Sequence, residues 1–395
     1  MSSFIPARPI PYGRQTIEES DIQAVVEVLR SDYLTQGPKP QEFEEAFARY
    51  IGARYASVMS SGAAALHLCA LALGVQAGDK VITTPITFTA SANCVRYCGG
   101  EVVFSDIDDE TYLLDIQKVR RLLEHTPKAE RAAYKGVIPV DFAGLPVDMQ
   151  AWRELADEFG LWILEDACHA PGASFFDTQG VERRAGDGSL ADLAIFSFHP
   201  VKHIATAEGG AVTTNRQDYY EKICRLRTHG ITREAQLLQE NHGAWYYEMH
   251  ELGFNYRLTD VQAALGIEQL KRAHESLERR RAIARRYEEA FAGTPVLARP
   301  TPEGFRHAYH LFVVEVDNRR RIYDALREQK IFAQVHYIPV HLQPYYRQFG
   351  WKRGDMPVAE RYYERCLSLP MFPALTGEEQ DYVIHTLLNA VGEGW

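Results

Sequence analysis

Apolar residues come in short runs over the first half of the chain, and the segments between them carry apolar residues at helical spacing. Such runs are typical of buried strands, and they lie at residues 56–59, 80–84, 101–104, 136–140, 162–164, 191–198 and 210–214. Helices are expected between them at 63–73, 91–97, 115–124 and 148–158. This alternation predicts an α/β fold with a mostly parallel seven-stranded sheet that helices cover on both faces.

The second half of the chain follows a different pattern. Residues 232–250 are polar and suggest a functional or subunit-bridging loop. A continuous helical pattern runs from 259 to about 291, and we interpret its charged middle, 278–281, as a solvated face that links two domains. Beyond residue 300 the pattern is α+β, with strands near 310–316 and 333–337 and helices near 319–329, 358–366 and 377–391. We therefore predict a large domain, with the N-terminal segment, over residues 1–260, and a linker helix with a small C-terminal domain over residues 261–395.

Composition narrows the class of protein. The chain has 395 residues, 46% of them hydrophobic, which is enough for more than one domain. Its net charge of -10 is spread along the sequence and disfavours nucleic acid or an anionic membrane as a partner. The first twelve residues lack the apolar stretch of a signal peptide, and no later segment has the roughly 20 apolar residues of a membrane span. We therefore expect a cytoplasmic protein.

The six cysteines follow no disulfide or zinc spacing. Cys94 and Cys98 are four residues apart and could share a helix face, but most of the six lie in apolar segments. Buried free thiols are the stronger interpretation, and we expect no metal site.

One lysine is a candidate covalent carrier of an aldehyde. Lys202 follows the apolar run that ends at Phe198, lies between His199 and His203, and precedes a Thr/Glu/Gly-rich turn at 206–210. A partly desolvated amine titrates low enough to form a Schiff base near neutral pH. Most lysines are solvated, but the apolar neighbours and the paired glycines favour the functional interpretation here.

A carboxylate gives that lysine a chemical partner. Asp166 ends the strand predicted from residue 162, a common place for a functional carboxylate in an open α/β sheet. By itself it could equally be a helix cap. Paired with Lys202, it indicates a pyridine cofactor, because a carboxylate that faces the ring nitrogen keeps it protonated and makes the ring an electron sink.

A phosphorylated cofactor also needs an anion site, and residues 60–66 offer one. Ser61, Gly62 and Ala63 follow a strand and open a helix, where free backbone N–H groups and the helix dipole attract anions. The same residues are also consistent with ordinary N-capping. Ser197 adds a hydroxyl five residues before the lysine. Phe88 could lie flat against the ring or pack in the core.

Together these residues resemble the fold-type-I pyridoxal-phosphate enzymes of the aspartate aminotransferase type, and among them the DegT/DnrJ/EryC1/StrS sugar aminotransferase family. The resemblance runs from Tyr12 to the C-terminal helix. Its motifs are Leu-Thr-Gln-Gly at 34–37, Pro-Ile-Thr-Phe at 85–88, Glu-Asp-Ala-Cys-His-Ala at 165–170, Ser-Phe-His-Pro-Val-Lys at 197–202, Glu-Gly-Gly at 208–210 and Gly-Phe-Asn-Tyr-Arg-Leu at 253–258.

The resemblance implies a role for each matching position. Lys202 binds pyridoxal phosphate, Asp166 pairs with the pyridine nitrogen, and His169 sits beside the ring. Ser197 and the amides of Gly62 and Ala63 hold the phosphate, although the family usually has a hydroxyl residue where this chain has Ala63, so that phosphate affinity is expected to be weaker. Asn255 is expected to contact the cofactor phosphate of a second subunit, which makes the protein a homodimer with shared active sites. The nearby Arg257 fits the carboxylate of the amino donor and a dimer ion pair equally well.

Within the family the chain is most similar to the UDP-4-amino-4,6-dideoxy-N-acetyl-β-L-altrosamine transaminases of pseudaminic acid biosynthesis. The implied reaction moves an amino group from L-glutamate, through pyridoxamine phosphate, to the C4 ketone of a UDP-linked 2-acetamido-2,6-dideoxy keto-hexose. The implied substrate contacts are Tyr12, Asp32, Tyr33, Leu34, Thr35, Gln334, Val335, His336 and Tyr337. Asp32 and Tyr33 also fit an ordinary loop.

Three other functions fit parts of the pattern. The acceptor could be another nucleotide-linked keto-sugar. Sugar 3-dehydratases related to the family carry histidine in place of the lysine, whereas the register of this motif puts Lys202 at that position and His203 after it. A non-catalytic sugar-nucleotide-binding regulator would not need both Lys202 and Asp166.

Overall fold

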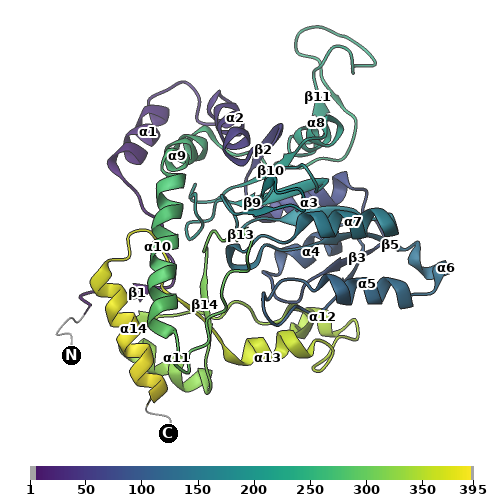
Figure 1. The fold of residues 1–395 in the computed structure, drawn as a ribbon. Coiled ribbons are helices and arrows are strands. Elements are labelled where there is room, and N and C mark those ends of the chain that lie inside the picture. The colour runs from purple at the N-terminus through teal and green to yellow at the C-terminus, as the bar shows by residue number, and fades with distance from the viewer. Residues whose placement is uncertain (1–5, 393–395) are drawn as a thin grey trace.

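The computed structural model describes residues 6–392; residues 1–5 and 393–395, at the outer ends of the two predicted domains, lie outside the described part. Its central feature is a seven-stranded sheet in the order β2-β10-β9-β6-β5-β3-β4 (Figure 1). Only β10 runs antiparallel to its neighbours in this sheet. The strands are β2 (Tyr55–Met59), β3 (Lys80–Thr83), β4 (Glu101–Phe104), β5 (Tyr134–Ile138), β6 (Trp162–Asp166), β9 (Leu193–Ser197) and β10 (Gly210–Thr214).

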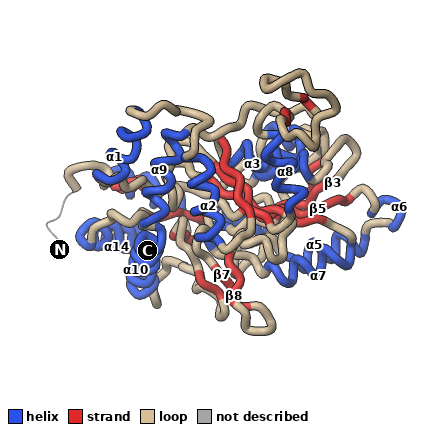
Figure 2. The backbone as a smooth tube through the Cα atoms, turned by 90° about the horizontal axis from the view of Figure 1, so that it is seen from above, coloured by secondary structure: helices blue, strands red, loops and turns tan. Residues whose placement is uncertain are grey.

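Helices lie on both sides of this sheet. In Figure 2, α3 and α8 are on one side and α5 and α7 on the other. The sheet strands are almost wholly buried, as expected for strands covered on both faces. The α/β fold and the mostly parallel sheet are confirmed. The helices before residue 300 are α1 (Glu19–Leu29), α2 (Lys39–Ile51), α3 (Gly62–Ala72), α4 (Ala90–Tyr97), α5 (Ile116–His125), α6 (Lys128–Arg131), α7 (Met149–Phe159), α8 (Gln217–Leu226), α9 (Asp260–Lys271) and α10 (Ala273–Phe291).

A second hydrophobic core lies in the C-terminal part and includes Ile10 from the N-terminal segment. Strand β1 (Ile10–Pro11) pairs in parallel with β15 (Ile331–Phe332), so the N-terminal segment is joined to this part. The division of the chain at residue 260 stays a prediction. The remaining elements here are β14 (Phe312–Glu315), β16 (Cys366–Leu369), α11 (Arg319–Glu328), α12 (Pro344–Arg347), α13 (Pro357–Arg365) and α14 (Gly377–Gly392).

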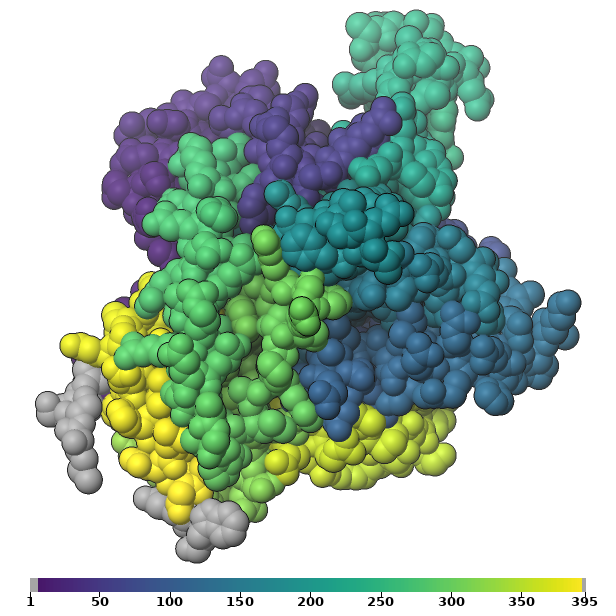
Figure 3. All heavy atoms as spheres, viewed as in Figure 1, coloured from purple at the N-terminus to yellow at the C-terminus, as the bar shows by residue number. Residues whose placement is uncertain are grey.

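Residues 232–250, hereafter the arm, stand away from the body of the molecule (Figures 1 and 3). At the base of the arm, β11 (Ile231–Thr232) pairs with β12 (Glu248–Met249). A further small sheet holds β7 (Ser174–Phe176), β8 (Glu182–Arg184) and β13 (Phe305–Arg306). None of the described helices is long and apolar enough to cross a membrane.

Two details of the predicted second half were wrong. The helical pattern from 259 to 291 breaks into α9 and α10 at Arg272, which caps both helices. The charged middle of α10 is only partly a solvated face. Glu278 is exposed, but Arg280 is 1% exposed and donates hydrogen bonds to the carbonyls of Tyr309, His310 and Met371. A guanidinium with several donors can be buried where backbone carbonyls converge on it, and the sequence pattern does not show that convergence.

The strand expected at 333–337 is also shorter than predicted. It is observed as β15 at Ile331–Phe332 and as a single bridge between Gln334 and Ser368. All six cysteines are free, and three of them, Cys69, Cys94 and Cys366, are buried.

Candidate active site

The carboxyl ends of β2, β6 and β9 meet at one edge of the sheet and border a cavity of about 440 Å³. This edge is where open α/β sheets bind ligands. The cavity collects eight of the nine predicted cofactor residues and three of the predicted substrate residues. They are Ser61, Gly62, Ala63, Phe88, Asp166, His169, Ser197 and Lys202, with Tyr12, His336 and Tyr337.

Lys202 lies in the turn that follows β9, and its backbone N–H donates to the carbonyl of His199. Burial lowers the pKa of its ammonium group, while the nearby Cys168 and Asp166 act in the opposite direction. The Lys202 Nζ is 3.4 Å from Nε2 of His310. An amine with a lowered pKa has the neutral form available for Schiff-base chemistry and for accepting a proton.

Asp166 ends β6 and is 5% exposed. The Ser91 hydroxyl donates to its Oδ2 at 2.6 Å, and the backbone N–H of Cys168 donates to its Oδ1 at 3.2 Å. Because the Ser91 proton is used in this way, the hydroxyl of Thr87, 2.8 Å from Ser91 Oγ, acts as the donor to Ser91. Two buried hydroxyls and one amide therefore fix the carboxylate in one orientation toward the cavity.

The start of α3 provides a close-fitting cradle for an anion. Ser61 caps the helix and accepts from the N–H of Ala64 at 3.0 Å, which leaves the first-turn N–H groups of Gly62 and Ala63 directed out of the helix end. A Cβ on Gly62 would lie 3.0 Å from Cβ of Ser197. One on Gly210 would lie 2.5 Å from the Ser61 carbonyl.

Because residues 62 and 210 are glycines, the start of α3 can pack closely against β9 and β10. This packing places the Ser197 hydroxyl beside the helix end. The donor set of amides and hydroxyls fits a phosphate. Together with the half-buried Lys202 and the buried Asp166 in the same cavity, it fits pyridoxal phosphate.

His169 is a neutral ring with a fixed tautomer. The backbone N–H of Ala143 donates to its Nδ1 at 3.2 Å, so the proton is on Nε2, which lies 3.2 Å from the Tyr337 hydroxyl. Burial, with a smaller contribution from Lys202, lowers the pKa of His169 well below its usual range. Phe88, on the cavity wall, is 62% exposed and has an accessible ring face.

A buried pair of carboxyl groups lies behind the site. Asp141 and Glu165 flank Asp166 along β6 and the end of β5, and burial raises the pKa of Asp141 to about 7. Burial and the neighbouring Asp141 raise the pKa of Glu165 well above its usual range. Asp141 accepts from the N–H of Val147, and Glu165 accepts from the N–H of Gly186. The pair anchors the loops that lead to Ala143 and β9.

The predicted substrate residues fall into two groups. Tyr12 and His336 pack with ring centroids 4.9 Å apart, and with Tyr337 they form an aromatic wall of the cavity. Gln334 is exposed and Val335 half-buried, both outside the cavity lining. The segment Asp32, Tyr33, Leu34 and Thr35 is exposed and lies against the start of α9 instead.

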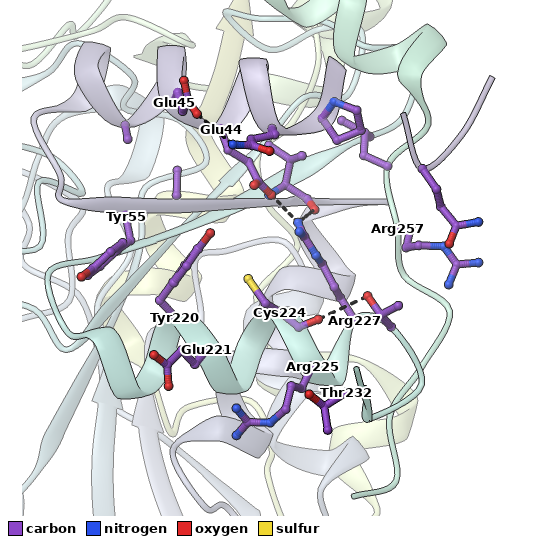
Figure 4. A pocket seen from close by; sticks show the side chains of 18 of the residues that line it. Glu44, Glu45, Tyr55, Tyr220, Glu221, Cys224, Arg225, Arg227, Thr232 and Arg257 are labelled. Atoms are coloured by element: carbon purple, nitrogen blue, oxygen red, sulfur yellow. Dashed lines mark hydrogen bonds and ion pairs between the residues drawn. The ribbon is translucent and has the colours of Figure 1, made fainter. Parts of the chain in front are cut away.

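Asn255 is exposed on the segment that follows the arm and does not line the cavity of its own chain. Arg257 lines a separate groove of about 910 Å³ between α2, α8 and β2 (Figure 4). In this groove Tyr55 and Tyr220 stack with centroids 4.8 Å apart, and Arg227 pairs with Glu44. The predicted roles of Asn255 and Arg257 are therefore possible only toward a second subunit.

Sequence reasoning missed Ser91 and His310. Ser91 is 75 residues from Asp166, and His310 is 108 residues from Lys202. Neither residue belongs to a recognisable motif. The only signal in the sequence is that each is a polar residue inside a largely apolar segment.

Comparison with known proteins agrees with this geometry. The model of the DegT/DnrJ/EryC1/StrS aminotransferase family matches residues 15–388. The spore coat polysaccharide biosynthesis protein SpsC of Bacillus subtilis is 39% identical over 391 residues, 97% of each chain. Among solved structures, Helicobacter pylori PseC, an aminotransferase involved in the biosynthesis of pseudoaminic acid, has a TM-score of 0.87 at 29% identity and covers 98% of this chain and 100% of its own.

A third relative bears on the cofactor. Spr1654 of Streptococcus pneumoniae, described as a sugar aminotransferase, has a TM-score of 0.87 at 29% identity in its pyridoxamine phosphate form, over 97% of this chain and 99% of its own. It is also known in a pyridoxal phosphate form. The chain therefore belongs to the DegT/DnrJ/EryC1/StrS aminotransferase family and is an aminotransferase that uses pyridoxal phosphate.

Proposed function

We propose that the protein transfers the amino group of L-glutamate to the C4 ketone of a UDP-linked 2-acetamido-2,6-dideoxy keto-hexose. The product is UDP-4-amino-4,6-dideoxy-N-acetyl-altrosamine, for pseudaminic acid synthesis in the cytoplasm. The observation that carries the proposal is one cavity in which Lys202 and Asp166 face an aromatic wall of Tyr12, His336 and Tyr337. The likeness to PseC supports the choice of sugar.

The chemistry divides between the cofactor and the residues of the chain. When bound, pyridoxal phosphate carries the amino group and withdraws electrons from the carbon that loses or gains a proton. Lys202 would hold the aldehyde carbon and, once free, move a proton with its Nζ. Asp166, fixed by Ser91, would hold the proton on the pyridine nitrogen.

The neutral His169 would orient the ring of the bound cofactor from one side, and its Nε2–H reaches the Tyr337 hydroxyl on the aromatic wall. The first turn of α3 and Ser197 would hold the phosphate. The aromatic wall excludes water from the face on which the sugar would bind.

A homodimer with shared active sites is part of the proposal. Asn255 is exposed and forms a bridge with Thr228, which lines the groove of Figure 4. The arm exposes Trp245, Tyr247 and Met249 at 74%, 50% and 62%. Several large apolar side chains exposed close together on an extended arm favour burial against another chain. The groove carries both signs of charge, so a two-fold copy of the same surface can pair opposite charges across it. The charged residues that line it include Glu44, Glu45, Glu221, Glu234, Arg54, Arg225, Arg227, Arg233 and Arg257.

A second candidate is an aminotransferase for another nucleotide-linked keto-sugar. The likeness to SpsC, at 39% identity, favours it as much as PseC favours the first. A sugar 3-dehydratase is disfavoured, because His203 is buried and bonds to the carbonyl of Ala308 while Lys202 lines the cavity.

The test has two stages. The absorption spectrum of the purified protein is recorded before and after addition of L-glutamate, and conversion from the pyridoxal to the pyridoxamine form is expected. UDP-linked 4-keto sugars, with and without the 2-acetamido group, are then added one at a time, and the aminated product is identified by mass spectrometry. A spectrum that glutamate leaves unchanged refutes the donor; amination of only a different keto-sugar refutes the acceptor.

A further inference from the structure

His310 is the residue nearest to the Lys202 amine that no sequence motif marks. Its Nε2 lies 3.4 Å from Nζ of Lys202, and its side chain lines the cavity. The residue is 4% exposed. Its ring packs against that of His169, with centroids 4.3 Å apart. His310 is thus placed to act on the amine that carries the chemistry.

The backbone around His310 is held from several sides. Arg280 of α10 donates to its carbonyl. The N–H of Leu311 donates to the carbonyl of Ala143 at 3.1 Å, and the N–H of Ala308 donates to that of Gly144 at 2.8 Å. The turn at 142–144 also fixes the tautomer of His169 through the N–H of Ala143. One turn therefore sets the position of both histidines.

The groups that face the His310 ring favour its neutral form. They include Lys202 after β9, His169 after β6, the adjacent His203 and Arg280 on α10. Burial, followed by the charge of Lys202, lowers the pKa of His310 well below its usual range. A neutral imidazole has one nitrogen that donates and one that accepts.

The contact with Lys202 indicates which nitrogen of His310 accepts. Nε2 of His203 lies 2.9 Å from the carbonyl of Ala308, so it carries the proton and Nδ1 of His203 is an acceptor. Nδ1 of His203 and Nδ1 of His310 are both buried without a hydrogen-bond partner among the described residues. An ammonium group has donors only, so Nε2 of His310, 3.4 Å from Nζ of Lys202, is the acceptor when Lys202 is protonated, and the proton of the His310 ring is then on Nδ1. That tautomer leaves Nε2 of His310 free to accept from Lys202.

We propose that His310 is a catalytic residue that accepts a hydrogen bond from the ammonium form of Lys202. The proposal rests on Lys202 as the proton-transferring amine and not on the identity of the sugar. When Lys202 takes a proton from a carbon, the C–H electron pair stays on the carbon and the Nζ lone pair forms the new N–H bond. The ammonium then donates one N–H to the Nε2 lone pair of His310, with no further bond broken.

This contact solves a problem that burial creates. A desolvated cavity favours the neutral amine, which can attack an aldehyde, but it disfavours the ammonium that must form during proton transfer. His310 supplies an acceptor for that ammonium without adding a charge. It also fixes the amine in one orientation, so that the remaining N–H groups point into the cavity.

Two variants of similar polarity separate this role from simple packing. In His310→Gln the side-chain amide reaches the place of Nε2 and keeps an acceptor there, whereas in His310→Asn it reaches only the place of Nδ1. We expect the single-turnover rate with L-glutamate to fall about tenfold in the Asn variant and to be largely restored in the Gln variant. KM for glutamate should change little, since the contact is made after binding.

A second measurement needs no turnover. The rate at which cofactor-free protein takes up pyridoxal phosphate is followed against pH, because the neutral Lys202 amine is the reacting form. Loss of the acceptor destabilises the ammonium, so the midpoint of this profile should move down by about half a unit to one unit in His310→Asn and stay in place in His310→Gln.

His341→Gln is the matched control, because His341 is fully buried and bonds to Glu360 outside the cavity. Its rate and its midpoint should equal those of the unmodified protein. Equal losses in the Gln and Asn variants, or no change of rate and midpoint in the Asn variant, would overturn the proposal. If L-glutamate does not react, the proposed function fails, but the pH profile of cofactor uptake can still be measured. Failure of the proposed function is therefore distinguishable from failure of this inference.

Discussion

Replacing Asp141 by asparagine should make the stability of the protein less dependent on pH. Asp141 is fully buried, accepts from the N–H of Val147 at 2.9 Å and lies against the carboxyl of Glu165. Asparagine keeps an oxygen for Val147 and offers its NH₂ group to Glu165. The variant therefore preserves the local bonding but has no proton to lose.

The magnitude follows from the pKa of Asp141. Burial raises this pKa from 3.8 to about 7, so between about pH 4 and pH 7 the folded protein holds a proton that the unfolded chain has released. The free energy of unfolding therefore falls as the pH rises through this window. A shift of about three pKa units corresponds to a change of about 4 kcal/mol in the free energy of unfolding. This is an upper value, because Asp141 and Glu165 titrate together. Above pH 7 the variant should be more stable than the unmodified protein.

The assay is urea unfolding of cofactor-free protein, followed by circular dichroism between pH 5 and pH 8.5. Asp148→Asn serves as the control, because Asp148 caps α7 by accepting from the N–H of Ala151, and asparagine caps equally well. The control should keep the pH slope of the unmodified protein, whereas Asp141→Asn should flatten it. An unchanged slope in Asp141→Asn would show that Asp141 is already ionised in the folded protein and refute the reasoning.

Other substitutions probe the cofactor site and the arm. Ala63→Ser adds a hydroxyl to the cradle and should lower the dissociation constant of pyridoxal phosphate about fivefold, measured by fluorescence titration; no gain would exclude contact with the phosphate. Ser91→Ala leaves Oδ2 of Asp166 unpaired and should lower the free energy of unfolding by about 1–3 kcal/mol in urea, with Ser91→Thr restoring it; equal stability of Ala and Thr would contradict the bond. Lys202→Ala should abolish covalent cofactor binding and turnover with an unchanged circular dichroism spectrum, and retained turnover would refute its role. Trp245→Asp should weaken self-association in analytical ultracentrifugation, and an unaltered association constant would remove the arm from the interface.

The local pattern of apolar and polar residues was enough to predict the strands of the sheet and the candidate site residues at its edge. The buried apolar runs predicted every strand of the seven-stranded sheet, because strands covered on both faces must be apolar along their whole length. Since parallel strands end at one edge, the polar residues at their ends, Asp166 and Ser197, were expected near the first turn of the helix at Gly62. The structure places them around one cavity.

The contacts between segments far apart in the sequence could be identified only from the tertiary structure. The bonds of Ser91 to Asp166 and of His310 to Lys202 join residues that are 75 and 108 positions apart in the sequence. The burial of Arg280 likewise depends on carbonyls from two other segments.

The sequence by itself determined the fold class and the cofactor and pointed to Lys202 as the lysine proposed to carry it, because periodicity and short motifs act through neighbouring residues and strand ends. Tertiary structure decided which polar groups surround that lysine, which tautomer His169 adopts, and that Asp32–Thr35 and Asn255 lie outside the cavity of their own chain. These features depend on packing between segments far apart in the chain, and a pattern of period two or 3.6 residues carries no information about such pairs.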